Sequence, residues 1–205
     1  MGYWFSHVLF KPLRRLARVF LNFTGGFEVK GLENVPKDGA YILASNHLSY
    51  SDPVMLLGAL PRPVYYMAAK ELFDIPVFGK VISFLQAFPV ERGKQDLRAL
   101  VTCQKLLQSG EAVVIYPEGR ICQGEGVGKL QAGAALLAIK SKVPIVPVFI
   151  VGSDKFLPLG DKWIHFTRKE VRFGKPIYFE EKASKEYIEH STEELHRAMT
   201  ELGKK

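Results

Sequence analysis

The apolar run AVVIY (residues 112–116) leads directly into the polar cluster PEGR (residues 117–120). A run without charged residues indicates a strand buried on both faces, which is typical of a parallel sheet. Other short apolar runs lie on both sides of it along the chain, and helical patterns separate them. This alternation predicts an α/β domain with a central, largely parallel or mixed sheet flanked by helices.

The same patterns place the other elements, working outward from residues 112–116. Further strands are expected at residues 27–30, 40–45, 64–68, 87–90, 144–150 and 170–174. Helices are expected at residues 3–10, 12–23, 53–60, 76–85, 94–108, 130–141 and 184–202. The first two are separated because Pro12 breaks or kinks a helix. The helix at 94–108 is expected to bury Leu97, Leu100, Val101 and Leu107.

Composition excludes several classes of protein. The 205 residues are 47% hydrophobic and 24% charged, which fits one globular domain and excludes a disordered or fibrous chain. Two cysteines are too few for a disulfide framework and indicate a reducing compartment. No uncharged stretch approaches the roughly 18 apolar residues of a spanning helix. Motifs for metal or nucleotide binding are not found, so no metal and no cofactor are expected.

Positive charge is concentrated near the beginning of the sequence. Residues 1–23 contribute +4 of the net charge of +7 and contain no acidic residue. At about 100° per residue the cations form one narrow helical face, opposite a wide aliphatic and aromatic face. This pattern is typical of a helix lying in the interface of an anionic membrane. The residues expected to bind the membrane are Trp4, Phe5, Lys11, Arg14, Arg15, Arg18 and Phe20.

We therefore predict an amphipathic interfacial anchor at residues 1–26, followed by one α/β domain at residues 27–205. The alternative is a helix that packs on the domain and exposes its charges to water. The abundance of Trp and Phe and the lack of acidic residues favour the interpretation as a membrane anchor. A nucleic-acid-binding arm is not expected, because it would carry fewer aliphatic residues opposite its cations.

Three polar clusters lie at or just after predicted strands, where open α/β sheets place their sites. In the first, NHLSYSDP (residues 46–53), His47 and Asp52 would lie about 140° apart on one continuous helix, so they meet only if the turn folds back. A His–carboxylate pair can remove a proton from a hydroxyl, because the carboxylate fixes the imidazole tautomer. The alternative is that Asp52 merely caps the helix that follows.

The second and third clusters are FPVERG (residues 88–93) and YPEGR (residues 116–120). Each combines an arginine, Arg92 or Arg120, with a glycine and nearby backbone N–H groups. This combination suits phosphate binding, because the planar guanidinium donates two parallel hydrogen bonds. Taken one at a time, such arginines are more often surface or ion-paired residues.

Together with VPIVPV (residues 143–148), these clusters resemble the four ordered blocks of the glycerolipid acyltransferase family, most closely the bacterial 1-acylglycerol-3-phosphate acyltransferases. The first block matches the family pattern NHxxxxD in full, and the blocks span about half of the chain. The segment MAAKELFDIPVFGK (residues 67–80) is also similar to the family. The third block departs from the family's EGTR, because this chain has EGRI and places Arg120 one position early.

The resemblance implies that residues 27–205 are an acyltransferase domain in which His47 is the general base and Asp52 its partner. The implied phosphate-binding residues are Arg92, Glu118, Gly119 and Arg120, and the implied acyl-donor site contains Pro144 and Pro147. The implied reaction moves a fatty acyl group from acyl-CoA or acyl-carrier protein to lysophosphatidic acid, giving phosphatidic acid. The implied location is the cytoplasmic face of the cell membrane, as a peripheral or monotopic protein.

Two alternatives to this function stay open at the level of sequence. An enzyme of the same fold could act on another acceptor, such as glycerol 3-phosphate, another lysophospholipid or a lipid without phosphate. A non-catalytic lipid-binding protein attached by residues 1–23 would not need His47.

Overall fold

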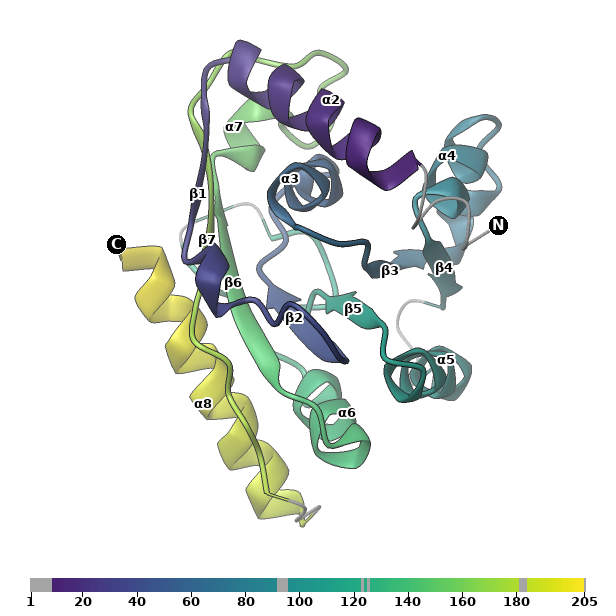
Figure 1. Cartoon of the computed structure of the whole chain (residues 1–205), viewed down its shortest axis with the longest axis vertical. Helices are drawn as coiled ribbons and strands as arrows, with labels where there is room; N and C mark the ends of the chain where they lie inside the picture. Colours follow the sequence, from purple (N-terminus) through teal and green to yellow (C-terminus); the bar gives the residue numbers. More distant parts are fainter. Residues whose placement is uncertain (1–8, 92–95, 123, 125, 181–183, 205) are drawn as a thin grey trace.

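The computed structural model describes residues 9–91, 96–122, 124, 126–180 and 184–204 (Figure 1). Its centre is a seven-stranded sheet in the order β1-β7-β6-β2-β5-β3-β4. The strands are β1 (Phe27–Lys30), β2 (Tyr41–Ser45), β3 (Tyr65–Ala69), β4 (Ala87–Val90), β5 (Ala112–Ile115), β6 (Ile145–Val151) and β7 (Lys169–Phe173). Strands β2 to β6 are parallel to one another, whereas β7 runs antiparallel to β6 and β1 pairs parallel with β7. The predicted α/β class with a mixed, largely parallel sheet is confirmed.

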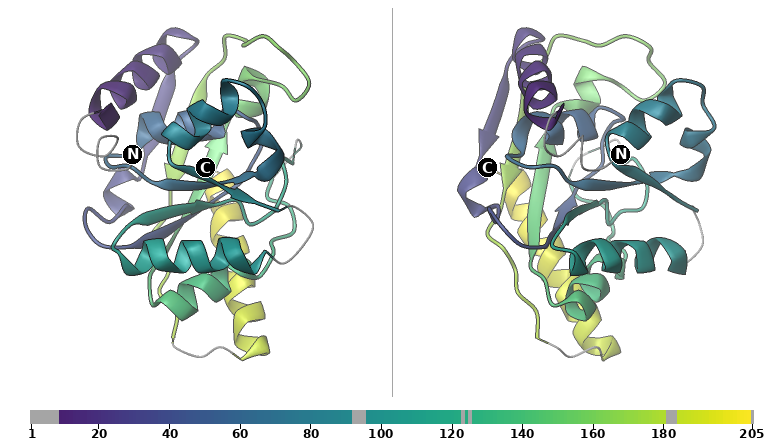
Figure 2. Two further views of the ribbon diagram at one scale, coloured as in Figure 1. Left: turned by 90° about the vertical axis from the view of Figure 1, so that its right-hand side faces the viewer. Right: turned by 45° about the vertical axis from the view of Figure 1, so that its right-hand side comes forward.

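Helices cover both faces of the sheet (Figures 1 and 2). In the described ranges the α-helices are α2 (Phe10–Phe23), α3 (Asp52–Ala59), α4 (Phe78–Phe84), α5 (Leu97–Gln108), α6 (Gly133–Ser141), α7 (Ser153–Phe156) and α8 (Lys185–Lys204), and the 3₁₀ helices are η2 (Leu32–Asn34) and η3 (Lys70–Phe73). Side chains of α5, α6 and α8 form the core on one face, and those of α2, α3 and α7 form the core on the other.

Strand β5 shows why the sequence AVVI is apolar throughout. All four of its residues are buried. Val113 and Ile115 pack toward α5 and α6, whereas Val114 packs on the opposite side with α3. Because successive side chains of a strand point to opposite faces, a strand covered by helices on both sides has no polar position.

Helix α2 is continuous through Pro12, so the predicted break at this proline is wrong for the described residues. Pro12 lies in the first turn of the helix, where the missing N–H has no partner to lose. The other predicted helix, at residues 3–10, lies almost entirely outside the described residues. Helix α2 ends before Gly25, whose φ of +114° and close approach to Thr167 exclude a side chain.

The apolar face of α2 is divided between two environments. Phe10, Ala17 and Leu21 are buried against the domain, where Gly58 of α3 lets the helices approach closely: a Cβ atom at Gly58 would lie 3.1 Å from Cδ1 of Leu21. A second apolar stripe stays exposed, formed by Leu16, Val19, Phe20 and Phe23. The packing alternative therefore accounts for only one of the two apolar stripes.

Helix α5 buries a face that only partly matches the predicted one: the predicted burial of Leu107 is confirmed. Ala99, Cys103 and Leu107 are buried, whereas Leu97 and Val101 are exposed. The predicted burial of Leu97 and Val101 is wrong, because α5 packs against β5 and α6 with the stripe centred on Cys103. Within the described ranges, no helix is long and apolar enough to cross a membrane.

Candidate active site

The candidate site lies where three neighbouring strands bring together segments distant in sequence. Strand β2 lies between β5 and β6, and the turn of residues 46–51 leaves its carboxyl end. Residues 116–120 leave the carboxyl end of β5, which runs parallel to β2. From β2 the chain continues to β3 and β4 on one side of β2, and later to β6 on the other side. This edge is therefore a topological switch point, where α/β proteins bind ligands.

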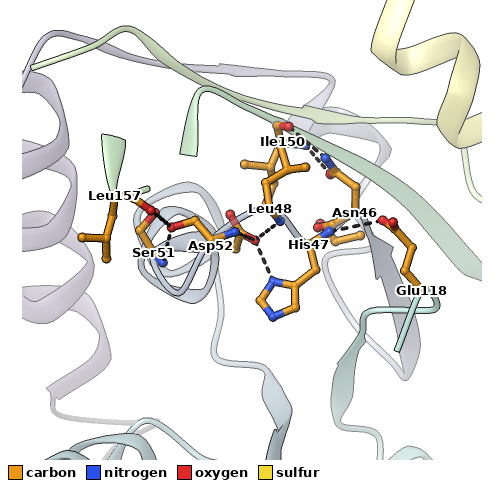
Figure 3. Close-up of polar contacts among 10 residues, drawn as sticks. Asn46, His47, Leu48, Ser51, Asp52, Glu118, Ile150 and Leu157 are labelled. Carbon is orange, nitrogen blue, oxygen red and sulfur yellow. Dashed lines mark hydrogen bonds and ion pairs between the residues drawn. The ribbon is translucent and has the colours of Figure 1, made fainter. Parts of the chain in front are cut away.

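Asn46 fixes the start of the turn, a role that the sequence analysis did not assign. Its buried side chain donates from Nδ2 to the carbonyl of Ile150 (3.0 Å) and accepts from the N–H of Ile150 (2.7 Å) (Figure 3). Asn46 therefore fastens the turn after β2 to the backbone of β6. The signal in the sequence is the asparagine at the first position of the NHxxxxD pattern, but its partner is 104 positions away.

His47 and Asp52 meet, because the turn folds back over the beginning of α3. Nδ1 of His47 lies 2.7 Å from Oδ2 of Asp52, and the same oxygen accepts from the N–H groups of Leu48 (2.8 Å) and Ser49 (3.0 Å) (Figure 3). Asp52 is fully buried and is the first residue of α3, so its carboxylate points back into the turn. The structure thus shows the predicted contact, and the carboxylate does not cap the helix.

The surroundings of His47 fix both its orientation and its tautomer. Its ring stacks on the ring of Tyr116 with centroids 4.0 Å apart and planes inclined by 19°. Burial, and next the charge of Asp52, raises the pKa of Tyr116 well above its usual value, so this phenol stays neutral. A neutral imidazole that donates Nδ1–H to a carboxylate carries its free lone pair on Nε2, the atom that can accept a proton.

The serines of the turn connect it to the segment after α7. Oγ of Ser49 donates to the carbonyl of Leu157 (2.7 Å), and Oγ of Ser51 donates to Oγ of Ser49 (3.0 Å). The proton of Ser49 is thus engaged with a main-chain carbonyl. The two hydroxyl groups position the turn.

Glu118 holds the His47 turn and the loop after β5 together. Its buried carboxylate accepts from the N–H of His47 (3.4 Å) and from the N–H of Gly128 (3.2 Å), and the N–H of Cys122 donates to the carbonyl of His47 (2.7 Å). A carboxylate repels phosphate, so these contacts support a positioning role for Glu118. Gly119 makes the turn with a φ of +73°, and the Arg120 side chain is exposed beside it.

The two prolines of the predicted acyl-donor site are not gathered around His47. Pro144 precedes the amino end of β6, whereas the His47 turn lies at the carboxyl ends of the parallel strands. Pro147 is a buried residue within β6, paired with Ala44. Arg92, Trp4 and Phe5 lie outside the described residues. In the part of the chain that the structure describes, no group of three or more His, Cys, Asp or Glu side chains could hold a metal ion.

Comparisons with known proteins point to one family of enzymes. The family model described as acyltransferase matches residues 26–151. The 1-acyl-sn-glycerol-3-phosphate acyltransferase of Bacillus subtilis is 32% identical over 201 residues, covering 96% of this chain and 98% of the relative. A chloroplastic protein of the same name from Brassica napus is 32% identical over 156 residues, which are 74% of this chain but only 45% of that longer protein.

A solved structure shows the same fold. The crystal structure of the 1-acyl-sn-glycerophosphate acyltransferase of Thermotoga maritima superposes with a TM-score of 0.76 at 24% identity, covering 94% of this chain and 79% of the other. The match to the family model and the match to nearly the whole Bacillus subtilis relative together show that this chain belongs to the acyltransferase family.

Proposed function

We propose that the protein transfers a fatty acyl group from an acyl thioester to the free hydroxyl of 1-acylglycerol 3-phosphate, giving phosphatidic acid. The observation that carries the proposal is the 2.7 Å contact between His47 and the buried carboxylate of Asp52. The names of the Bacillus subtilis and Brassica napus relatives support this acceptor. The proposed thioester donor is acyl-CoA or acyl-carrier protein.

The proposed reaction needs one proton acceptor and one leaving group. Nε2 of His47 takes the proton of the acceptor hydroxyl as its oxygen attacks the thioester carbonyl and forms the new C–O bond. The negative charge of Asp52 stabilises the imidazolium that results. The tetrahedral intermediate then breaks its C–S bond, and the imidazolium returns the proton to the departing thiolate. No step uses a metal or a covalent acyl-enzyme.

Arg120 is the proposed ligand of the acceptor phosphate on the turn after β5. It is exposed two residues beyond Glu118, whose carboxylate contacts the backbone of His47. A phosphate bound by Arg120 would therefore lie near the catalytic turn. Because this chain has EGRI in place of EGTR, other acceptors such as glycerol 3-phosphate or another lysophospholipid remain the competing proposal.

Analysis of the products of the purified full chain tests the proposed function. The protein is incubated with lysophosphatidic acid and either acyl-CoA or acyl-carrier protein, and phosphatidic acid is measured by mass spectrometry. Parallel reactions contain glycerol 3-phosphate, a lysophospholipid with a larger headgroup, or monoacylglycerol. Preferred acylation of lysophosphatidic acid supports the proposal. Preferred acylation of another acceptor, or no acylation at all, contradicts it.

Replacement of Arg120 tests phosphate recognition. Arg120→Ala is expected to raise KM for lysophosphatidic acid by about ten- to a hundredfold, since a charge-assisted hydrogen bond contributes roughly 1.5–3 kcal/mol. The kcat should change little if the arginine binds substrate and transition state alike. Lys140→Ala, an exposed cation on α6, is the matched control. An unchanged KM in Arg120→Ala would show that the phosphate binds elsewhere.

A further inference from the structure

The segment between α7 and β7 exposes large apolar side chains that no part of the proposed reaction uses. These are Leu159, Trp163, Ile164 and Phe166, of which Trp163 is 77% and Phe166 68% exposed. A loop normally presents small or polar residues to water. Four large apolar side chains exposed within eight residues of sequence instead indicate a surface for a protein or a membrane.

This patch is continuous with the exposed apolar stripe of α2. The exposed rings of Phe23 and Phe166 lie edge to face with centroids 6.0 Å apart. Beneath the surface, Phe20 contacts the buried ring of Phe156 in α7 in the same way at 6.2 Å. Helix α2 and the segment after α7 lie at the same end of the molecule, whereas α5 and α6 lie at the other end (Figures 1 and 2). Side chains more than 130 positions apart in sequence thus form one surface.

The charge around this surface favours an anionic bilayer over a second copy of the chain. Residues 9–24 and 153–168 together carry seven basic and two acidic side chains. Lys11, Arg15, Arg18 and Lys162 are exposed beside the apolar residues. Two copies apposed through this surface would bring like charges together, whereas an anionic membrane accepts both the cations and the aromatic rings.

We propose that residues 157–166 are a second membrane-binding element, which docks on an anionic bilayer together with the exposed face of α2. The choice of a membrane as the partner rests on the charge of this surface and, in addition, on the lipid substrate of the proposed function. Trp163 suits the level of the lipid headgroups, because its indole combines an apolar ring with a polar N–H, and Phe166 suits the boundary with the acyl chains.

The structure holds this second element firmly to both α2 and the His47 turn. At one end the carbonyl of Leu157 accepts from Ser49 (2.7 Å). At the other end the N–H of Thr167 donates to the carbonyl of Thr24 (3.1 Å), and the buried ammonium of Lys169 donates to the carbonyls of both Thr24 (2.9 Å) and Thr167 (2.7 Å). Docking by two fixed elements would orient the His47 turn relative to the bilayer. Docking by a single helix would leave the domain free to rotate about that helix.

Tryptophan fluorescence tests the proposal directly, because the chain has only two tryptophans, Trp4 and Trp163. In the variant Trp4→Phe all indole emission comes from Trp163. With vesicles of phosphatidylcholine and phosphatidylglycerol we expect a blue shift of this emission, and with brominated phosphatidylcholine we expect quenching. If the protein binds the vesicles but the emission of Trp163 is neither shifted nor quenched, the proposal is overturned. A blue shift without lipid that rises with protein concentration indicates a second copy and also overturns it.

Vesicle sedimentation of the full chain measures the contribution of the segment to binding. Trp163→Ser and Phe166→Ser should each weaken binding roughly tenfold or more, since an aromatic side chain leaves water on docking. Tyr178→Ser is the matched control, because Tyr178 is 75% exposed and lies outside both segments. Equal losses in all three variants would overturn the proposal. These measurements need no substrate, so they stand even if the product analysis finds no phosphatidic acid.

Discussion

Oδ2 of Asp52 has two tasks, because it accepts from the imidazole of His47 and from two backbone N–H groups of the turn. Asparagine retains one carbonyl oxygen for the backbone hydrogen bonds but loses the negative charge that stabilises an imidazolium. Replacement by asparagine therefore separates the structural contribution of Asp52 from its chemical one. The same separation cannot be made with alanine, which would leave both N–H groups of the turn without an acceptor.

We expect His47→Ala and Asp52→Asn each to lower kcat by roughly 10²–10⁴-fold, the usual contribution of general acid–base catalysis. Thermal unfolding should show that both variants stay folded, with a smaller change in stability than in rate. His190→Ala, an exposed histidine on α8, should keep the parental kcat. Steady-state kinetics measures the kcat of each variant. A parental kcat in His47→Ala would rule out His47 as the general base.

Some of these residues could be predicted from sequence and others could not, for a physical reason. His47 and Asp52 are five positions apart in one turn, so their residue types and spacing suggest the pair. Glu118 contacts His47 across 71 positions of sequence, and Asn46 contacts Ile150 across 104. Such contacts depend on the order of strands in the sheet, which local patterns do not contain.

At the scale of elements, strands were more predictable than helix faces. Each predicted strand lies within one residue of the observed one at both ends. Central strands such as β2 and β5 are short apolar runs bounded by turn residues, and this makes their limits visible in the sequence. Helix α5 has apolar residues around more than half of its circumference, so its pattern is compatible with two buried faces. Contacts with β5 and α6 select the face of Ala99 and Cys103.

Helix α2 offers a matched pair of leucines on its two apolar stripes. Leu21→Ala removes a fully buried side chain next to Gly58 and should lower the free energy of unfolding by about 2–5 kcal/mol. Leu16 is 66% exposed, so Leu16→Ala should change stability by less than about 0.5 kcal/mol. Urea unfolding measures both variants. Equal destabilisation would mean that α2 packs through both stripes and leaves no apolar face for a membrane.

At the scale of the whole molecule, the basic and aromatic surface proposed to bind a membrane lies next to the candidate active site. The cations of α2, the aromatic residues of the segment after α7 and the turn of His47 are linked by contacts through Phe23, Leu157 and Ser49. Moving a lysophospholipid from a membrane into water is unfavourable, because its acyl chain becomes exposed to water. The acyl thioester donor, in contrast, approaches from the aqueous side. A catalytic turn at the edge of a membrane-binding surface would meet both substrates without extracting the lipid.

The electrostatic part of membrane binding can be removed without touching the packing of α2. Lys11, Arg15 and Arg18 are exposed, whereas Arg14 is half-buried and burial lowers its pKa, so the first three are the ones to replace. At about 1 kcal/mol per cation near an anionic surface, replacing all three with glutamine should weaken binding to phosphatidylglycerol vesicles by roughly a hundredfold at low salt.

The difference in binding between the triple variant and the parental protein should shrink toward 1 M salt, where charges are screened beyond about 3 Å. Residual binding at high salt should come from Phe20, Phe23 and the segment after α7, and sedimentation across a salt series measures both components. A triple variant that binds as tightly as the parental protein at every salt concentration would show that the cations of α2 face water and not lipid.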